Sequence, residues 1–356
     1  MTSTTSPPIQ RQAGFATGHR TLPAWAPWAI VVACLALGLL AGTVLGTSIS
    51  LAVVLGVALT AIVLPLISRQ VEGGRRAKDR FVTLVVTAAF ALALLPLLSL
   101  LVTAIQNGVT RLDWEFLSSD MRGVLKAGGG AYHAIIGTLL ITGAAALISV
   151  PIGIMTAVYL VEYGRGRVAR AVTLMVDVMT GIPSIVAGLF AFALFAIFFG
   201  PSVRFGIGGA VALSVLMVPV VVRSVEEMLK LVPNELREAS YALGVPKWRT
   251  VVKVVLRTAA AGIATGVTIA VARVIGETAP LLIIVGSTNS LNTDLTDGRM
   301  ASLPVFTYYS YTIPGVPPEF GVDRAWAAAL TLFILVMGLN LIARLVSRYF
   351  SLSNSR

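Results

Sequence analysis

The sequence predicts an all-α membrane protein, a polytopic bundle of about eight transmembrane helices. Hydrophobic residues make up 56% of the 356 residues and charged residues only 12%. The mean hydropathy is +0.88, which lies well outside the range of soluble domains. Residues 21–68 contain no charged side chain, and this length accommodates two helical spans of about 20 residues each. A β-barrel would show short alternating segments instead of these continuous apolar runs.

Continuous apolar runs define the eight expected spans. They are residues 26–46, 49–68, 81–104, 134–161, 171–199, 206–222, 258–285 and 325–346. The fourth and fifth runs are longer than one bilayer thickness requires, so we expect these helices to be tilted or broken. Pro151 and Pro183 are the expected break points, because neighbouring helices can satisfy the carbonyl groups that a proline frees.

Basic residues are distributed unevenly among the loops between these spans. Twenty Lys and Arg residues fall on the face that also holds both termini, and six fall on the opposite face. Because cytoplasmic loops carry the excess of basic residues, we expect a plasma (inner) membrane protein with both termini in the cytoplasm. These loops account for the net charge of +11, and no nucleic-acid-binding module accompanies it.

A basic linker, expected in the cytoplasm at residues 69–80, divides the chain into two parts. Residues 1–24 are rich in Thr, Ser, Pro and Gly and are expected to be disordered. Residues 25–68 are expected to form a transmembrane hairpin, retained as an anchor instead of being cleaved as a signal. Residues 81–350 hold the other six spans and every charged residue expected within the membrane, and their longest cytoplasmic loop is 223–257.

The sequence offers little for metal or nucleotide chemistry. Cys34 is the only cysteine, so neither an intrachain disulfide nor a thiolate metal site is expected. His19 and His133 have no partners at ligand spacing. The phosphate-binding motif G-x-x-x-x-G-K-[ST] does not occur, so any ATP that the protein uses must be bound by another chain.

A capped helix is predicted within the cytoplasmic loop 223–257. Asn234 is the expected N-cap, Gly244 the left-handed stop, and Pro246 falls in the first turn of the next helix. One face of this helix carries small and apolar residues, which are Leu236, Ala239, Ser240 and Leu243. Another protein can approach such a face closely. The alternative is a plain solvated connector, although a connector needs only a few residues.

Five residues of this loop follow a distinctive spacing: Glu238, Ala239, Gly244, Val254 and Leu256. The loop resembles the cytoplasmic loop of ABC-importer permeases, in which E-A-A-x-x-x-G is followed by I-x-L-P. The resemblance implies a coupling helix that fits a groove on the ATPase subunit, with Glu238, Ala239 and Gly244 at that contact. Ser240 replaces the second alanine of the motif and Arg257 replaces its proline.

The seventh expected span carries two charges, Arg273 and Glu277, near its middle. Four residues apart on one helix, they would share a face. An unpaired Arg at the bilayer centre costs about 3 kcal/mol on insertion scales, so its side chain must face the protein interior or an aqueous path. A guanidinium donates to phosphate or carboxylate oxygens. The alternative is a structural salt bridge between two spans. Asp177 is expected near the headgroups or capping a neighbouring helix.

The segment around this pair is A-R-V-I-G-E-T-A-P-L-L at residues 272–282. It resembles the A-R-x-x-G-E-T-A-P-L segment of phosphate-specific permeases. Residues 181–189, beginning G-I-P-S-I-V, and residues 301–304, A-S-L-P, agree with the same family. The likeness covers roughly residues 130–350 and is closest to the A-type (PstA) subunit. It implies that Arg273 and Glu277 are associated with the passage of phosphate.

The resemblance also implies a set of partners and a division of labour. Residues 81–350 would be a six-helix ABC-importer permease domain that pairs with a homologous C-type permease subunit. Two copies of an ATPase subunit would bind ATP and Mg²⁺ and hydrolyse the ATP, so this chain would be no enzyme and would bind no cofactor. An extracytoplasmic phosphate-binding protein would deliver inorganic phosphate.

Three other functions remain open from the residues alone. The importer could carry another oxyanion, such as molybdate, sulfate or phosphonate. A secondary carrier would transport without an ATPase, but no internal repeat is evident and the capped cytoplasmic helix argues against it. A membrane sensor or scaffold would have no evident use for Arg273 and Glu277.

Overall fold

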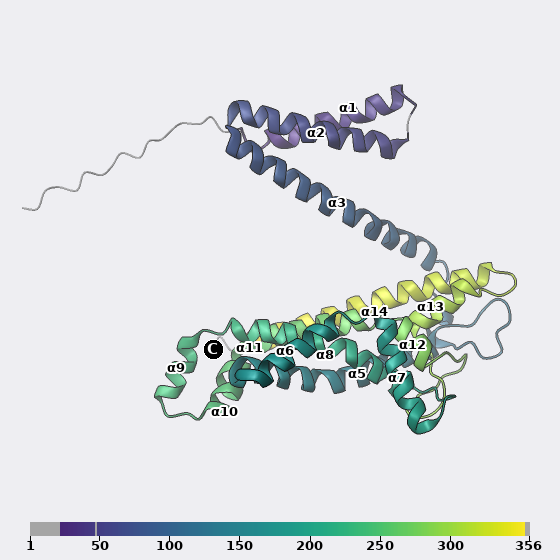
Figure 1. Ribbon diagram of the computed structural model, residues 1–356. Helices are drawn as coiled ribbons and strands as arrows, with labels where there is room; N and C mark the ends of the chain where they lie inside the picture. The colour runs from purple at the N-terminus through teal and green to yellow at the C-terminus, as the bar shows by residue number, and fades with distance from the viewer. Residues whose placement is uncertain (1–21, 47, 353–356) are drawn as a thin grey trace, which may run out of the picture. The chain divides into compact units, whose positions relative to one another are not determined.

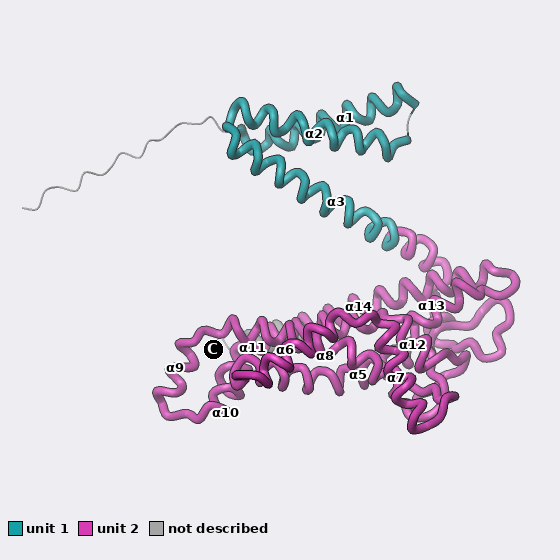
Figure 2. Tube along the Cα trace, viewed as in Figure 1, with its two compact units in different colours: residues 1–101 teal, residues 102–356 magenta. Residues whose placement is uncertain are grey.

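The computed structural model describes residues 22–46 and 48–352. Most of the disorder expected for residues 1–24 therefore concerns residues outside the described part. The chain divides into two compact units, Met1–Leu101 and Val102–Arg356, hereafter unit 1 and unit 2 (Figure 2). In the described ranges every regular element is a helix, which confirms the all-α class.

The candidate membrane spans also agree with the expected bundle. Within residues 22–46 and 48–352, seven helices are long and apolar enough to cross a membrane, or eight if one sharply bent pair counts as a single span. The seven single helices are Ala26–Val44, Ile49–Val71, Gly74–Gly108, Tyr132–Tyr163, Gly206–Lys230, Lys247–Val274 and Glu319–Leu345.

Unit 1 is built on a hairpin of α1 (Ala26–Val44) and α2 (Ile49–Val71) (Figure 1). The buried residues recur every fourth position, as Cys34, Gly38 and Gly42 on α1 and Ala52, Gly56, Thr60, Leu64 and Ser68 on α2. A Cβ added at Gly38 would lie 2.5 Å from the backbone nitrogen of Gly56. The two backbones therefore touch through small residues, which is how helices pack where lipid removes the hydrophobic driving force.

A buried ion pair closes the turn between α2 and α3 (Gly74–Gly108). The Glu72 carboxylate accepts hydrogen bonds from Nε and Nη2 of Arg80, at 2.7 and 2.9 Å, and from the Ser68 hydroxyl at 2.8 Å. Gly73 has a φ of +92°, a conformation that favours glycine. The hydrogen bonds from Arg80 lower the pKa of Glu72 to about 2, so this carboxylate stays ionised.

The core of unit 2 is the pair α5 (Tyr132–Val158) and α8 (Gly206–Lys230). Their contact contains Gly153, where an added Cβ would lie 2.5 Å from Val221 Cγ1. The expected break at Pro151 is wrong, because α5 continues as a helix through this residue. Instead, α5 changes to a π-helical turn, η1 (Tyr159–Tyr163), at its far end.

The expected break at Pro183 is confirmed. Helix α6 (Gly166–Thr180) ends, and α7 (Ser184–Phe199) begins after Pro183 and turns away by 108°. Two properties of proline explain the break: it lacks an N–H, and it disfavours the helical conformation in the residue before it.

The expected continuous helix 258–285 is interrupted. Helix α10 (Lys247–Thr250), a π-helical turn η2 (Val251–Val255) and α11 (Leu256–Val274) form one run that stops at Val274. A short helix, α12 (Ala279–Ile284), then starts with Pro280 in its first turn. Arg273 and Glu277 therefore do not lie one turn apart on a single helix, and the shared-face argument is wrong.

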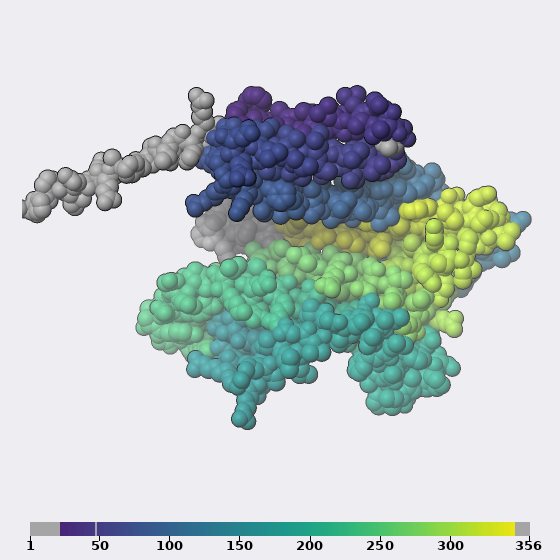
Figure 3. Space-filling model, turned by 45° about the horizontal axis from the view of Figure 1, so that its top comes forward, coloured from purple at the N-terminus to yellow at the C-terminus, as the bar shows by residue number. Residues whose placement is uncertain are grey.

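The remaining elements occupy the two ends and one side of unit 2. Helix α9 (Asn234–Ala242) and α10 lie at one end, and α12 and α13 (Leu303–Thr312) lie at the other (Figure 1). In the space-filling view, the segment that contains α9 and α10 forms a lobe at one end of unit 2 (Figure 3). Helix α14 (Glu319–Leu352) packs along α11 and α13, and the short α4 (Trp114–Ser118) contacts α5.

Candidate functional site

Three helix ends, one helix side and the segments that connect the helices enclose a cavity of about 190 Å³ in unit 2, hereafter the helix-end cavity. Its lining residues are Met179, Thr180, Ile182, Ser184, Leu216, Pro219, Val220, Arg273, Val274 and Glu277. They come from the end of α6 and the break that follows it, the start of α7, the middle of α8, the end of α11 and the segment between α11 and α12. The two charged residues singled out in the sequence therefore line one small cavity.

Arg273 occupies the last turn of α11, where it is exposed and lines the helix-end cavity. A cation in this position is favoured by the partial negative charge at the carboxyl end of a helix. Glu277 is half-buried in the segment that follows, where its backbone N–H donates to the Val274 carbonyl at 3.0 Å. Helix termination thus brings both charges to the cavity without placing them on one face.

The alternative of a structural salt bridge finds no support at Arg273. The ion pairs found among residues 22–46 and 48–352 join other side chains, and none includes Arg273 or Glu277. The guanidinium therefore retains donors that can meet a ligand. An unneutralised cation lining a cavity is an arrangement suited to binding an anion.

The break between α6 and α7 adds uncharged donors to the same cavity. Ser184 is the first residue of α7, and the first turn of a helix has N–H groups without intrahelical acceptors. The first turn also carries partial positive charge. The Thr180 hydroxyl donates to the Val176 carbonyl at 2.9 Å, which holds the side chain at the end of α6. Arg273 and the start of α7 therefore present positive potential to one space.

Two of the quoted sequence stretches meet beside the cavity, and the third does not. An added Cβ at Gly188 of α7 would lie 2.6 Å from Pro280 Cα, so glycine is required for α7 to pack against α12. In contrast, the stretch 301–304 packs against α5: the Leu303 N–H donates to the Thr138 hydroxyl at 2.7 Å. An added Cβ at Gly137 would lie 2.0 Å from the Ala301 carbonyl oxygen. This third stretch positions helices and does not line the cavity.

The predicted cytoplasmic helix is present as α9, with its expected end and a different start. Gly244 has a φ of +74°. Its N–H donates to the Tyr241 carbonyl at 2.9 Å, and the Val245 N–H donates to the Ser240 carbonyl at 3.2 Å. This pair of hydrogen bonds is the Schellman pattern. The expected N-cap is wrong: Pro233 occupies that position, and Asn234 is the first helical residue.

The expected small face of α9 is only partly free. Leu236 is 42% exposed and Leu243 is 83% exposed, whereas Ser240 is buried. The Ser240 hydroxyl lies 2.8 Å from the Thr250 hydroxyl, so it holds α9 against α10. Glu238, Ala239 and Leu243 remain exposed and form the available surface. Of the two residues that depart from the motif, Ser240 therefore faces inward and Arg257 is exposed.

Arg237 fastens α9 to the core of unit 2, in an arrangement hereafter the Arg237 clamp. Its Nη2 and Nε donate to Glu162 Oε1 at 2.9 and 3.1 Å. Its Nη1 donates to the Val232 carbonyl at 2.6 Å, and Nη2 also donates to the Leu229 carbonyl at 3.0 Å. Glu162 belongs to η1 at the end of α5, and Leu229 lies in the last turn of α8. One guanidinium thus joins α9 to both central helices.

A second charged network ties α6 to α8. Arg223 pairs with Asp177 of α6 and with Glu226, whose carboxylate also accepts from Lys230 at 2.7 Å. Arg223 and Lys230 belong to the last turns of α8, although the sequence placed them in the loop 223–257. Asp177 therefore pairs with a side chain within a neighbouring helix and does not cap a helix, as one of its two expectations proposed.

Sequence reasoning missed the partners of Arg237 and Arg223. Glu162 is 75 residues from Arg237, and Asp177 is 46 residues from Arg223, so no local spacing signals either pair. The available signal was weaker: an acidic residue close to the end of an apolar span needs a cationic partner. No group of three or more His, Cys, Asp or Glu side chains in the described residues is placed to hold a metal ion.

Comparison with known proteins yields both a family and close relatives. Residues 149–354 match the family described as binding-protein-dependent transport system inner membrane component. The chain is 48% identical over 287 residues to phosphate transport system permease protein PstA 1 of Mycobacterium tuberculosis (strain CDC 1551 / Oshkosh), which covers 79% of this chain and 92% of that protein. It is 49% identical over 279 residues to PstA of Mycobacterium leprae (strain TN), covering 77% and 90%.

A solved structure with similar architecture comes from a more distant protein. It is that of a bacterial alginate ABC transporter in complex with an alginate pentasaccharide-bound periplasmic protein. The TM-score is 0.53 at 15% identity, over 77% of this chain and 96% of that chain. This likeness concerns the fold alone.

Proposed function

This chain belongs to the binding-protein-dependent transport system inner membrane component family, and on that premise we propose the identity of its cargo and partners. The chain is the A-type permease subunit of an ABC importer that moves inorganic phosphate into the cytoplasm. It works with a homologous C-type permease, two ATPase subunits and an extracytoplasmic phosphate-binding protein. ATP and Mg²⁺ bind to the ATPase subunits, so this chain carries no cofactor, and both of its termini lie in the cytoplasm.

The observation that carries the proposal is the helix-end cavity with Arg273. Its volume of about 190 Å³ is below the roughly 300–1,000 Å³ typical of sites for drug-sized molecules, so it suits a small ion. A guanidinium and the start of a broken helix both favour an oxyanion. Discontinuous helices whose ends point at the solute are a recurrent device in membrane transporters.

Glu277 favours phosphate over fully deprotonated oxyanions. A carboxylate accepts hydrogen bonds only, and phosphate at neutral pH retains at least one P–OH group that can donate to it. Sulfate has no such proton, so the Glu277 carboxylate would repel it without any compensating hydrogen bond. A polar acceptor that one anion satisfies and another does not is an effective source of discrimination.

The coupling step uses α9. Closure of the ATPase subunits presses on the exposed residues Glu238 and Ala239, with Gly244 ending the helix that carries them. The Arg237 clamp transmits the displacement to Leu229 at the end of α8. The same helix carries Leu216, Pro219 and Val220 of the helix-end cavity. Movement of one helix therefore changes access to the cavity between the two sides of the membrane.

The test is uptake of labelled phosphate by the reconstituted complex carrying Arg273→Ala. Because the substitution removes the only cationic side chain that lines the helix-end cavity in the described residues, we expect phosphate uptake to fall at least 100-fold. Assembly and ATP hydrolysis should persist. Arg167→Ala, at an exposed position of α6, is the matched control and should transport normally.

Normal uptake by the Arg273→Ala complex would remove the proposed role of this residue. Competition of labelled phosphate by sulfate, molybdate and phosphonate decides the cargo: inhibition by one of them at lower concentration than by unlabelled phosphate contradicts phosphate as the substrate. Transport by this chain alone in liposomes, without ATPase subunits, contradicts the ATP-driven mechanism.

A further inference from the structure

The turn between α2 and α3 collects basic residues on two separate faces of unit 1. Arg69 ends α2, and the first turns of α3 carry Arg75, Arg76, Lys78 and Arg80. Such clustering at one end of two spans follows the general charge bias of membrane loops. The charge bias does not explain a difference between the two faces. The basic side chains of one face have acidic neighbours, and those of the other face do not.

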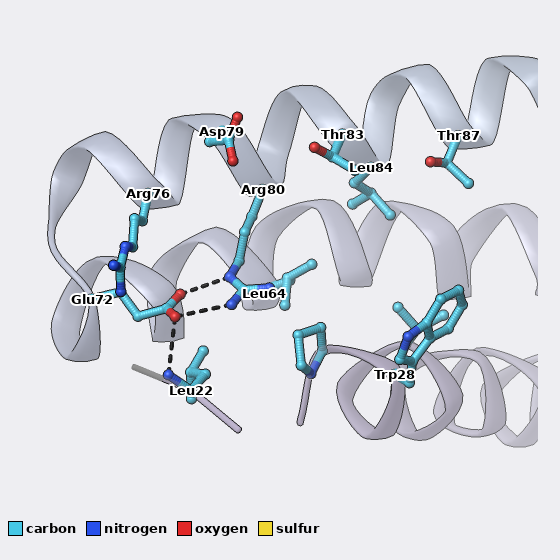
Figure 4. A pocket seen from close by; sticks show the side chains of 12 residues that line it. Leu22, Trp28, Leu64, Glu72, Arg76, Asp79, Arg80, Thr83, Leu84 and Thr87 are labelled. Carbon is cyan, nitrogen blue, oxygen red and sulfur yellow. Dashed lines mark hydrogen bonds and ion pairs between the residues drawn. The ribbon is translucent and has the colours of Figure 1, made fainter. Parts of the chain in front are cut away.

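One face is neutralised by carboxylates. A cavity of about 560 Å³ is lined there by Arg76 and Arg80 together with Glu72 and Asp79. Figure 4 shows Arg80 directed at Glu72, which also accepts from the Leu22 N–H at 3.0 Å. Two cations face two anions, so the charges on this face balance.

The other face holds cations without carboxylates, hereafter the basic groove. It has a volume of about 820 Å³ and is lined by Arg69, Arg75 and Lys78, with no acidic side chain among its lining residues. All three basic side chains are exposed, and none takes part in the ion pairs found within the described ranges. The groove therefore has a net positive charge with no internal counter-ion.

The wall of the basic groove becomes apolar away from the turn. Leu66 on α2 and Phe81 and Val82 on α3 line it and are 54%, 43% and 58% exposed. Pro65 completes this part. Cations at the turn followed by an apolar surface along the spans match a molecule with an anionic head and a hydrocarbon tail.

We propose that the basic groove binds an anionic phospholipid of the membrane leaflet at the α2–α3 turn, with its phosphate on Arg69, Arg75 and Lys78. Basic pockets between helices at this depth favour anionic headgroups, and the groove places its cations at the end of both spans, where headgroups lie. The acyl chain lies along Leu66, Phe81 and Val82. Unit 1 is thereby a lipid-binding module, distinct from the helix-end cavity in unit 2.

The test measures retention of phosphatidylglycerol, against phosphatidylcholine with the same acyl chains, by the purified full chain in neutral detergent. Native mass spectrometry counts the bound lipids. Each basic residue contributes about fivefold to such binding, so the triple variant R69Q/R75Q/K78Q should lose about 100-fold in phosphatidylglycerol affinity. Phosphatidylcholine binding should change little.

The matched control removes the same charge elsewhere. R165Q/R167Q/R170Q acts on three exposed residues at and within α6 and should retain phosphatidylglycerol as the unaltered chain does. R69K/R75K keeps the charge and should retain binding, and thermal unfolding of each variant confirms that the chain is folded. Equal loss in both triple variants, or no loss in R69Q/R75Q/K78Q, overturns the proposal. Displacement of the lipid by millimolar inorganic phosphate overturns the lipid as occupant.

Discussion

Unit 1 and the core of unit 2 are both helical, but they are held together by different means. In unit 1, α1 and α2 touch through residues that recur every four positions, with Gly38 opposite Gly56. In unit 2, a large buried apolar core is supplemented by long-range ion pairs such as Arg237–Glu162 and Arg223–Asp177, which join helices far apart in the sequence. The first arrangement is repetitive and local, whereas the second depends on single side chains. The helix-end cavity lies in the unit whose helices are joined by these long-range pairs.

Among these contacts, the largest effect is expected from Arg237→Ala, which breaks the connection between α9 and the core. Glu162, whose side chain is only 6% exposed, would be left buried without its cation, at a cost of about 4 kcal/mol. We expect phosphate uptake to fall about 100-fold while the ATPase subunits still hydrolyse ATP. The measurement is the ratio of phosphate transported to ATP hydrolysed in proteoliposomes.

The control for this variant is Arg249→Ala, which removes an exposed arginine stacked on Trp248 in the same loop. It should leave the ratio unchanged. The double variant Arg237→Met/Glu162→Leu removes both charges and should recover much of the lost stability, because no buried charge is left alone. Unchanged coupling in Arg237→Ala would show that α9 communicates by another route.

The next effect is expected at Glu72, which forms the one ion pair found among the described residues of unit 1. Its pKa is lowered from an ordinary value of 4.5 to about 2 by the hydrogen bonds from Arg80. A lowered pKa means that the carboxylate stabilises the fold above pH about 4.5 and loses this contribution as the pH falls towards about 2. The full contribution is about 3 kcal/mol. Glu72→Gln should lower the stability of unit 1 by this order at pH 7.

Hydrogen–deuterium exchange of residues 26–71 as a function of pH measures this contribution. The unaltered chain should exchange faster as the pH is lowered from 5 to 3, after correction for the intrinsic rate, and Glu72→Gln should show no such step. Asp79→Asn, at an exposed carboxylate of the same cavity, is the control. A step of equal size in Glu72→Gln would assign the pH dependence to another group.

A smaller effect is expected from Gly38→Leu in the α1–α2 contact. The added side chain must enter a space where even a Cβ would lie 2.5 Å from Gly56, which costs about 2 kcal/mol. Thermal unfolding in detergent should fall accordingly, and exchange should rise in α1 and α2. Ala36→Leu places the same side chain on the exposed side of α1 and should be neutral. A Gly38→Leu chain as stable as Ala36→Leu would refute close packing.

The smallest effect is expected from Ser240→Ala, which restores the alanine of the permease motif. It removes the hydrogen bond to Thr250 and should cost about 1 kcal/mol. The double variant Ser240→Ala/Thr250→Val removes both polar partners and should be nearly neutral. The comparison of the two in thermal unfolding separates the lost bond from the unsatisfied hydroxyl. A single variant that is more stable than the unaltered chain would contradict this assignment.

The sequence predicted features that depend on local chemistry. Pro183 breaks a helix because proline lacks a donor, and Gly244 ends one because it adopts a positive φ. The same reasoning failed at Pro151, where packing against α8 keeps α5 intact. It also failed at Val274, where α11 ends inside the segment expected to be one helix, shortly before Gly276 and Pro280. The first failure reflects tertiary packing, whereas the second lies beside residues that favour the end of a helix.

The candidate site was predictable in part. Charge in an apolar segment was enough to single out Arg273 and Glu277, and the structure brings both to the helix-end cavity. Their roles in transport stay predictions. Ser184 and Pro219 carry no charge, so hydropathy alone gave no reason to place them beside Arg273. The partner of Arg237 could not be predicted, because the two residues are 75 positions apart and sequence periodicity reports only on neighbours within one helix.

Helix α8 connects the Arg237 clamp at one end with the wall of the helix-end cavity at Pro219. Linkage between two binding equilibria is necessarily mutual. If ATPase closure weakens anion binding by some factor, then a bound anion must weaken closure by that same factor. Under the proposed function, an anion held in the helix-end cavity would then oppose closure of the ATPase subunits, and its release would remove that opposition. The continuous helix α8 is the element through which the transported ion would act on the partner that drives its transport.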